Sequence, residues 1–227
     1  QKAIEIDPSY SLAFSGMSLT YFNEWSCQLW ERWDVSHKGA YEWAKKAIEL
    51  DEQNYIAAMV LGRIYVYEAE YDLAEHYLRK ALRLNPNDTE CVMQIATCFV
   101  CLGYLAEAEN LYRNAPDISQ VKYDFAHIGA LIAFEKGDIK KSIALIAQSK
   151  PAWVDFYALV AAAHYENGDT ESMQRCWQNF LDQFQRKIKN GEKPEDQSEA
   201  IQWAINVNPF RYTSRQMPFL EYIGNKK

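Results

Sequence analysis

Three cysteines have a spacing that could serve metal binding. Cys91, Cys98 and Cys101 stand at i, i+7 and i+10, which places them on roughly one face of a helix. A structural zinc site usually takes four ligands, from two C-x2-C pairs or from cysteine together with histidine. The chain has no second C-x2-C pair, and its four histidines are scattered: His37, His76, His127 and His164. We therefore interpret the three cysteines as small packing residues, and we predict no metal site and no cofactor.

Catalysis by a nucleophilic cysteine or serine would need a base held beside it. His164 stands at a core position of a helical pattern, and no partner can be named for His127. Neither of the glycine-rich phosphate loops, G-x-G-x-x-G and G-x-x-x-x-G-K-[ST], occurs in the chain. We predict that the protein is not an enzyme.

The composition excludes several other functions. The chain of 227 residues is 48% hydrophobic, enough for a substantial core, and carries 24 basic against 31 acidic residues. This acidic balance argues against nucleic acid and anionic membranes as partners. No apolar run approaches the roughly 20 residues needed to span a bilayer. The five cysteines are odd in number and show no disulfide-scaffold spacing, which favours reduced thiols and a cytoplasmic location.

The elements that hold these residues follow from an internal repeat. KAIEIDPSY at 2–10 recurs as KAIELDEQN at 46–54 and as KALRLNPND at 80–88. The second and third copies are 34 residues apart and the first and second are 44 apart, so the first repeat is longer by about ten residues. Each copy reads as a helix end followed by a turn, so the repeating unit is helical.

The 34-residue period and its small and large residues resemble the tetratricopeptide repeat (TPR), with the pattern W-x2-L-G-x2-Y, A-x3-F and P. The second repeat supplies Ala58, Leu61, Gly62, Tyr65, Ala74, Leu78, Ala81 and Pro86. Small residues such as Gly62 let the first helix of a pair (helix A) approach the second (helix B), and stacking of the pairs supplies the core. The resemblance implies an all-α fold, a right-handed superhelix (α-solenoid) of about five helix pairs plus C-terminal helices.

The resemblance divides the chain into a solenoid, 1–185, and a helical tail, 186–227, that we expect to pack on it. The expected repeats cover about 9–52, 53–86, 87–116, 121–151 and 152–185. Gly137 and Gly168 mark turns between helices A and B, where a left-handed backbone is often needed. Pro116 and Pro151 predict short second helices in repeats three and four.

In the tail, the pattern predicts a loop or frayed helix end over 186–197. A helix follows over 198–207, with Ser198 as a candidate N-cap. Residues 208–223 read as a turn followed by a short terminal helix.

The long first repeat and the tail motifs NPF (208–210) and FLEYI (219–223) resemble one bacterial group more narrowly. It is the C-terminal TPR region attached to class III adenylate or guanylate cyclases and to winged-helix transcriptional regulators. This resemblance implies an N-terminal effector domain in the same polypeptide and a role in signal transduction or transcription regulation. The opening residues, which read as a helix end, lead us to expect a fragment of a longer protein.

The TPR resemblance also implies a concave groove lined by the A helices, in which a protein or peptide partner binds. The predicted groove residues are Leu12, Ser15, Leu19, Met59, Arg63, Tyr67, Met93, Gln94, Thr97, His127 and Leu131. Their mixed character suits an apolar or basic peptide or helix, and the chain's own tail, 210–223, is a second candidate occupant. The set lacks the lysines and asparagines with which co-chaperone TPR domains grip a C-terminal carboxylate.

Aromatic residues gather in and beside the insertion of the first repeat: Trp25, Trp30, Trp33, Tyr41 and Trp43. One interpretation is an exposed contact surface, and the one we favour is a packed cluster that caps the solenoid. The main functional hypothesis is a non-catalytic interaction scaffold. The alternative is a small-molecule-sensing domain in which these aromatic residues form a pocket that controls an effector domain.

Overall fold

Antiparallel helix pairs form most of the described part of the protein, as the repeats predict. The computed structural model describes residues 2–29, 33–115, 125–149, 153–194 and 196–225, and within these ranges every regular element is a helix. The chain divides into two compact units, residues 1–98 (unit 1) and 99–227 (unit 2), and the division falls inside one helix. None of the helices in the described ranges is both long and apolar enough to cross a membrane.

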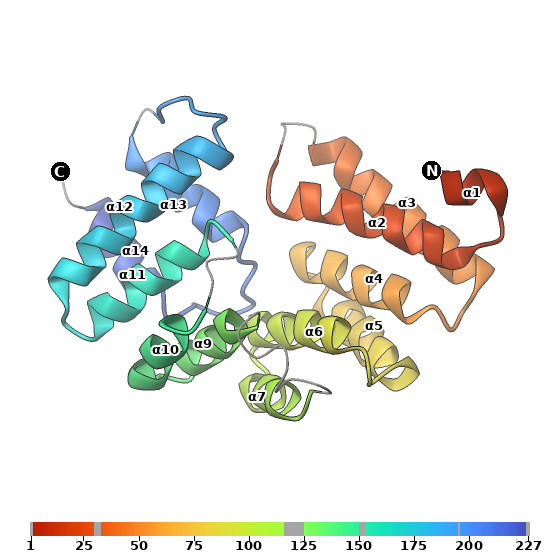
Figure 1. Ribbon diagram of the computed structural model, residues 1–227, viewed down its shortest axis with the longest axis horizontal. Helices are drawn as coiled ribbons and strands as arrows, with labels where there is room; N and C mark the ends of the chain where they lie inside the picture. Colours follow the sequence, from red (N-terminus) through yellow and green to blue (C-terminus); the bar gives the residue numbers. More distant parts are fainter. Residues whose placement is uncertain (1, 30–32, 116–124, 150–152, 195, 226–227) are drawn as a thin grey trace. The chain divides into compact units, whose positions relative to one another are not determined.

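Unit 1 holds two complete helix pairs, α2 with α3 and α4 with α5 (Figure 1). Its helices are α1 (Lys2–Ile6), α2 (Ser11–Ser26), α3 (Trp33–Leu50), α4 (Tyr55–Tyr67), α5 (Tyr71–Leu84) and the first part of α6 (Thr89–Leu102). The expected second repeat corresponds to α4 and α5, and the enlarged first repeat corresponds to α2 and the 18-residue helix α3.

A polar residue before α4 fixes where that helix begins. The side chain of Asn54 accepts a hydrogen bond from the Ala57 amide at 2.9 Å, as an N-cap does. The same side chain donates to Ser11 Oγ at 2.8 Å, and it is only 2% exposed. The turn between α3 and α4 is thereby tied to the start of α2.

The close approach predicted at Gly62 is confirmed. A Cβ atom placed on Gly62 would lie 2.6 Å from Leu78 Cγ and 3.0 Å from the Leu78 backbone nitrogen. No real Cβ makes a contact as short as 2.6 Å, so α4 and α5 reach this distance only because the residue is glycine.

Unit 2 continues the helix pairs and ends in two helices outside them (Figure 1). Its elements are the end of α6, α7 (Leu105–Asn114), α9 (Ala126–Glu135), α10 (Ile139–Ile146), α11 (Phe156–Glu166), α12 (Thr170–Lys187), α13 (Gln197–Asn206) and α14 (Met217–Gly224). Helices α7 and α10 have 10 and 8 residues, against 14 in α5. The second helices of repeats three and four are therefore short, as expected, while Pro116 and Pro151 lie outside the described residues.

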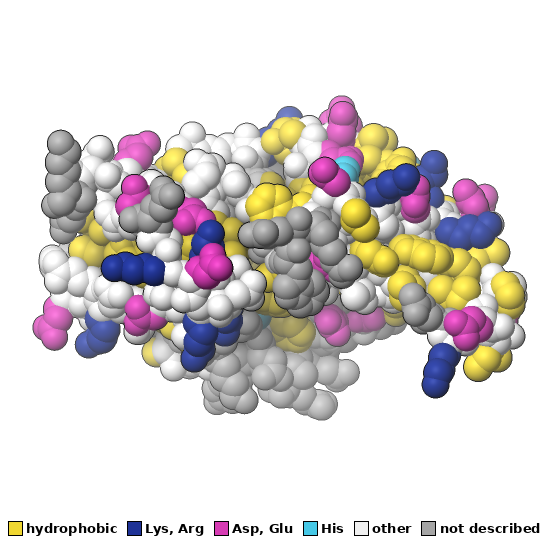
Figure 2. Space-filling view, turned by 90° about the horizontal axis from the view of Figure 1, so that it is seen from above, with side chains coloured by type: hydrophobic (Ala, Val, Ile, Leu, Met, Phe, Trp, Pro, Cys, Tyr) yellow, Lys and Arg dark blue, Asp and Glu magenta, His cyan; other side chains and the backbone are white. Residues whose placement is uncertain are grey.

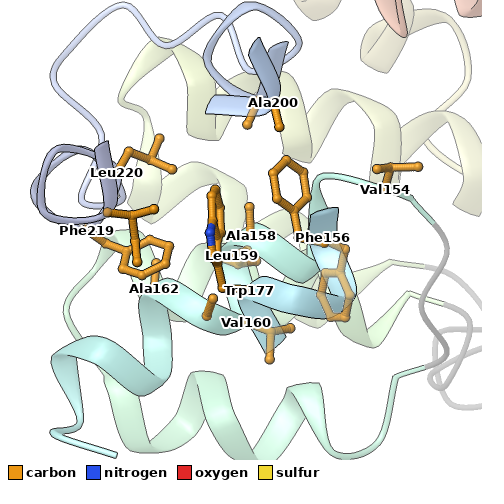
Figure 3. Packing of buried hydrophobic residues seen from close by; sticks show 14 of the residues in the cluster. Val154, Phe156, Ala158, Leu159, Val160, Ala162, Trp177, Ala200, Phe219 and Leu220 are labelled. Carbon is orange, nitrogen blue, oxygen red and sulfur yellow. The ribbon is translucent and has the colours of Figure 1, made fainter. Parts of the chain in front are cut away.

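The core of unit 2 joins α11 and α12 to the two terminal helices (Figure 3). The Trp177 ring of α12 lies 5.5 Å from the Phe219 ring of α14, measured between centroids. Trp203 of α13 lies 5.6 Å from Phe184 by the same measure. Segments remote in sequence thus form one buried aromatic cluster.

Two turn predictions have different outcomes. Gly137 and Gly168 have φ angles of +82° and +76°, so both adopt the expected left-handed conformation. The prediction of Ser198 as an N-cap is wrong, because the side chain of Asp196 caps α13 and accepts a hydrogen bond from the Ser198 amide at 2.7 Å. The helix begins at Gln197, one residue after Asp196, so Ser198 already lies inside its first turn, and the Asp196 carboxylate carries a charge that favours the helix N-terminus.

Candidate functional site

In unit 1 the predicted groove residues lie on α2, α4 and the first part of α6. Leu12 is 44% exposed. Several others are half-buried: Leu19, Arg63, Tyr67, Gln94 and Thr97. Three are buried and present almost no surface to a partner: Ser15, Met59 and Met93.

Arg63 is fixed on an aromatic platform between α2 and α4. Its guanidinium carbon lies 4.2 Å from the centroid of the Phe22 ring, which is fully buried. This distance is within the range of a cation–π interaction. The Tyr67 ring contacts the same Phe22 ring edge-on at 5.7 Å and Trp25 at 5.3 Å. The half-buried side chains of Arg63 and Tyr67 are thus held in place by aromatic contacts.

The cysteines of α6 are poorly suited to chemistry. Burial raises the pKa of Cys91 to about 12 and that of Cys98 to about 11, although the charge of Arg63 acts in the opposite direction. Both thiols are therefore protonated at neutral pH, and a protonated thiol is a poor nucleophile and metal ligand. Among the described residues, histidine, cysteine and acidic side chains form no group of three or more that could hold a metal ion.

The remaining predicted groove residues belong to unit 2. His127 and Leu131 lie on α9 and are half-buried. The His127 ring packs edge-on against Phe156 at 6.2 Å. The structure therefore places the predicted site residues in both units.

The aromatic residues of the first repeat pack on several different neighbours. Trp25 lies 4.3 Å from the His37 ring, and Trp43 lies 5.5 Å from Phe14, both between centroids. Trp33 is 42% exposed, and Trp30 lies outside the described residues. These side chains therefore serve partly as core and partly as surface.

A second candidate site lies in the segment between α13 and α14, residues 208–216, which we call the strap. The Arg211 amide donates to the Cys101 carbonyl at 2.8 Å, at the end of α6. A Cβ atom placed on Gly103, in the next turn, would lie 3.5 Å from the Tyr212 ring. At Arg211 the strap therefore meets the end of α6.

Glu135, the last residue of α9, is the centre of the strap's contacts. Its carboxylate accepts hydrogen bonds from Ser214 Oγ at 2.6 Å, from the Arg215 amide at 3.2 Å and from Tyr212 Oη at 3.3 Å. Burial raises the pKa of Glu135, and these three donors partly offset that rise. Burial and the nearby Glu135 charge also raise the pKa of Tyr212. The carboxylate is thus desolvated and satisfied by the strap.

Two further carboxylates hold the ends of the strap. Arg215 Nη1 donates to Glu166 Oε2 at 3.0 Å, at the end of α11. Asn208 Nδ2 donates to Asp155 Oδ2 at 3.3 Å, at the start of α11. Sequence reasoning suggested that the tail could occupy the groove, but it did not identify these partners, because nothing local pairs residues so far apart.

A pocket of about 420 Å³ lies beside the strap. Its walls come from α13, the strap and α14: Ala204, Ile205, Asn208, Phe210, Arg211, Tyr212, Thr213, Ser214, Gln216, Met217 and Leu220. The lining combines apolar side chains with several hydrogen-bonding groups. The volume falls within the range of small-molecule sites.

Comparison with known proteins supports one repeat directly. Residues 57–88, covering most of α4 and α5, match the model of the tetratricopeptide repeat. The chain is also similar to the BBSome complex member BBS4 of Bos taurus, with 27% identity over 106 residues. The matched stretch is 47% of this chain and 20% of that protein, so the chain spans about a fifth of the relative's length.

Solved structures resemble the fold at low sequence identity. PilW, a widely conserved type IV pilus biogenesis factor, gives a TM-score of 0.63 at 15% identity, covering 94% of this chain and 91% of that one. YrrB, a TPR protein with an unusual peptide-binding site, gives a TM-score of 0.49 at 17% identity, covering 80% and 90%. Together with the repeat match, the PilW likeness indicates a TPR-type α-solenoid fold.

Proposed function

We propose that this TPR-type protein is a non-catalytic scaffold that binds a protein or peptide partner on the A helices of unit 1. The observation that carries the proposal is Leu12, a predicted groove residue whose apolar side chain is 44% exposed. Tyr10 and Ile6, just before it in the chain, are 47% and 84% exposed. Apolar side chains grouped at one surface favour a protein contact.

Unit 1 carries further exposed apolar side chains. Trp33 and Val35, at the start of α3, are 42% and 60% exposed. Figure 2 shows hydrophobic side chains among charged ones over α1, α2 and α3. On the A helices, the fixed ring of Tyr67 and the mixed polar residues of α6 suit an amphipathic helix or peptide with an apolar face.

The test is binding of synthetic amphipathic peptides that share leucine positions and differ in charge, one lysine-rich and one glutamate-rich, measured by fluorescence anisotropy. Leu12→Ala should weaken binding about fivefold, and Tyr67→Ala about tenfold or more, because a rigid aromatic side chain is a typical hot spot. Leu73→Ala is the matched control, because Leu73 is also 44% exposed but lies on α5, a B helix. Equal losses from Leu12→Ala and Leu73→Ala, or no binding by either peptide, would contradict the proposal.

A more specific role extends this proposal. The NPF and FLEYI motifs support a regulatory or sensory region of a larger cytoplasmic bacterial protein that controls signalling or transcription. In that role an N-terminal effector domain would convert partner binding into an output. Determining the complete reading frame tests it: a frame that encodes neither a cyclase nor a winged-helix domain would contradict this role and leave the scaffold proposal intact.

The pocket beside the strap favours a second candidate function, the sensing of a small molecule. Phe210 and Tyr212 supply aromatic surface there, far along the chain from the Trp25–Trp43 region that the sequence suggested. Thermal-shift screening against a metabolite library tests this candidate, with Ile205→Trp as the variant that narrows the pocket. A ligand whose shift is unchanged in this variant would not be bound in the pocket.

A further inference from the structure

The strap follows an edge built from the turns of three successive helix pairs. Arg211 contacts the end of α6, and Tyr212, Ser214 and Arg215 contact the end of α9. Arg215 also reaches the end of α11. Each of these contacts is made where a helix A ends, so the edge repeats the same structural feature three times, while Asn208 contacts Asp155 at the start of α11. A short non-helical segment thus contacts three consecutive helix pairs, as a bound peptide would.

The chemistry of the edge selects a particular kind of segment. Glu135 accepts from two hydroxyl groups and one backbone amide, and Glu166 accepts from a guanidinium. The Arg215 guanidinium also lies over Gly137, where a Cβ atom would be only 2.7 Å from Nη2. The edge therefore matches tyrosine, serine and arginine in the order Tyr-x-Ser-Arg.

The strap is held mainly from one side. Ser214 and Gln216 are buried, while Arg211, Thr213 and Arg215 remain exposed. The pocket of about 420 Å³ borders the strap, so part of its surface is not packed against the core. The desolvation of Glu135 opposes the hydrogen bonds that the strap supplies, because a buried carboxylate loses hydration. The outer side of the strap is thus open to solvent, while its two ends continue into α13 and α14.

We propose that this edge is a binding site for an extended segment of a partner protein with the pattern Tyr-x-Ser-Arg, and that the strap is its resident occupant. A partner binds by displacing the strap and presenting the same donors to Glu135 and Glu166. This site belongs to unit 2 and goes beyond the function proposed for unit 1. A failure of the Leu12 test leaves it standing, and the reverse also holds.

The test uses the full chain with a weakened strap, Ser214→Ala/Arg215→Ala, and a fluorescein-labelled synthetic peptide of residues 207–217. The double variant should bind this peptide at least tenfold more tightly than the unmodified chain, because its own strap competes less well. A matched peptide in which the same serine and arginine are alanine should bind at least tenfold more weakly. Adding Glu135→Gln to the double variant should also weaken binding at least tenfold, whereas adding Glu171→Gln, on α12, should not.

Hydrogen exchange of α11 and α12 shows whether the double variant keeps its fold, and Arg215→Ala alone replaces it if it does not. A folded variant that fails to bind the peptide, or binds it equally well with Glu135→Gln, overturns the proposal. A second peptide that keeps only Tyr-x-Ser-Arg on glycine and alanine flanks should bind as well, and its failure would contradict the proposed pattern. If light scattering shows that the variant forms dimers through exchanged straps, the occupant is a second copy of this chain and the partner proposal is wrong.

Discussion

Two helix pairs differ in the side chains that pack their helices together. They are α4 with α5 in unit 1 and α11 with α12 in unit 2. In α4 and α5 a glycine, Gly62, brings the helices together, and Leu78 fills the space beside it without any solvent exposure. In α11 and α12 large rings fill the core, and Phe219 and Trp203 from the terminal helices complete it. The first pair carries the repeat signature, and the second carries only part of it.

The difference shows how the last helix pairs of a solenoid can be packed when their sequences match the repeat pattern only in part. A single helix pair cannot bury its apolar face alone, so each pair depends on what stacks against it. Helices α13 and α14 cover the last pair in unit 2, and Phe219 and Leu220 point from α14 into the cluster around Trp177 (Figure 3). The tail is therefore part of the core of unit 2.

The largest expected effect is that of removing a tail ring. Phe219→Ala should lower the free energy of unfolding of unit 2 by about 3–5 kcal/mol, because Phe219 is 1% exposed and its loss leaves a cavity. Hydrogen exchange with mass spectrometry should show the loss of protection in α11 and α12 and little change in α4 and α5. Val35→Ala, at a residue 60% exposed, is the control.

If Phe219→Ala reduced hydrogen-exchange protection equally in the two helix pairs, the proposed difference between their cores would be wrong. A loss below about 1 kcal/mol would show that α14 contributes little to the core of unit 2.

A smaller effect is expected from filling the close approach in unit 1. Gly62→Ala should destabilise unit 1 by about 1–3 kcal/mol, because the new methyl group would overlap Leu78 and its backbone. Gly16→Ala, with no atom within 4 Å of the added Cβ, should instead stabilise by about 0.5–1 kcal/mol through the higher helix propensity of alanine. Urea denaturation followed by circular dichroism measures both.

A close approach between α9 and α7, helices of neighbouring repeats in unit 2, sharpens the comparison. A Cβ on Gly129 would meet the hydroxyl end of the Tyr112 ring at 2.5–2.6 Å, and this hydroxyl makes no hydrogen bond within the described structure. Because the end of a side chain can shift more readily than a backbone, Gly129→Ala should cost less than Gly62→Ala. An equal or greater cost would show that the Tyr112 ring is held as firmly as the α5 backbone.

The smallest expected effect concerns a charge cluster that ties the short helix α7 to α9 and α10. Glu109 lies 3.0 Å from Lys141 Nζ and also pairs with Lys136 and Arg113. Hydrogen bonds from Lys136 and Lys141 lower the pKa of Glu109 to about 2. Because its folded pKa is lowered, Glu109 stabilises the fold above its unfolded value of about 4.3, and this stabilisation is lost as the pH falls toward 2.

Glu109→Gln should therefore cost less than about 1 kcal/mol at neutral pH, since the side chains of the three cations are 37–63% exposed and water screens the ion pairs. The same variant should flatten the fall in unit 2 stability between pH 4.3 and 2, measured by urea denaturation at each pH. Lys38→Gln, in the exposed pair with Glu42 on α3, is the matched control for unit 1. An unchanged pH profile in Glu109→Gln would contradict the assigned role of this cluster.

The sequence by itself determined the helical fold, the period and several local details. The copies of KAIELD-type helix ends placed α4 and α5, and Gly137 and Gly168 marked turns where both residues have positive φ. These features are local or periodic, so spacing alone reveals them. The N-cap of α13 shows the limit of this reasoning, because Asp196 and Ser198 are both suitable caps and only the backbone geometry decides between them.

Only the tertiary structure decided which of the predicted groove residues are accessible and what the tail does. Met59 and Met93 share a helix type and pattern with Leu12, yet they are buried and Leu12 is not. Glu135 and Ser214 are 79 residues apart in the chain and meet at 2.6 Å. Exposure and long-range hydrogen bonds depend on how helices stack, and no periodic pattern in the sequence records that stacking.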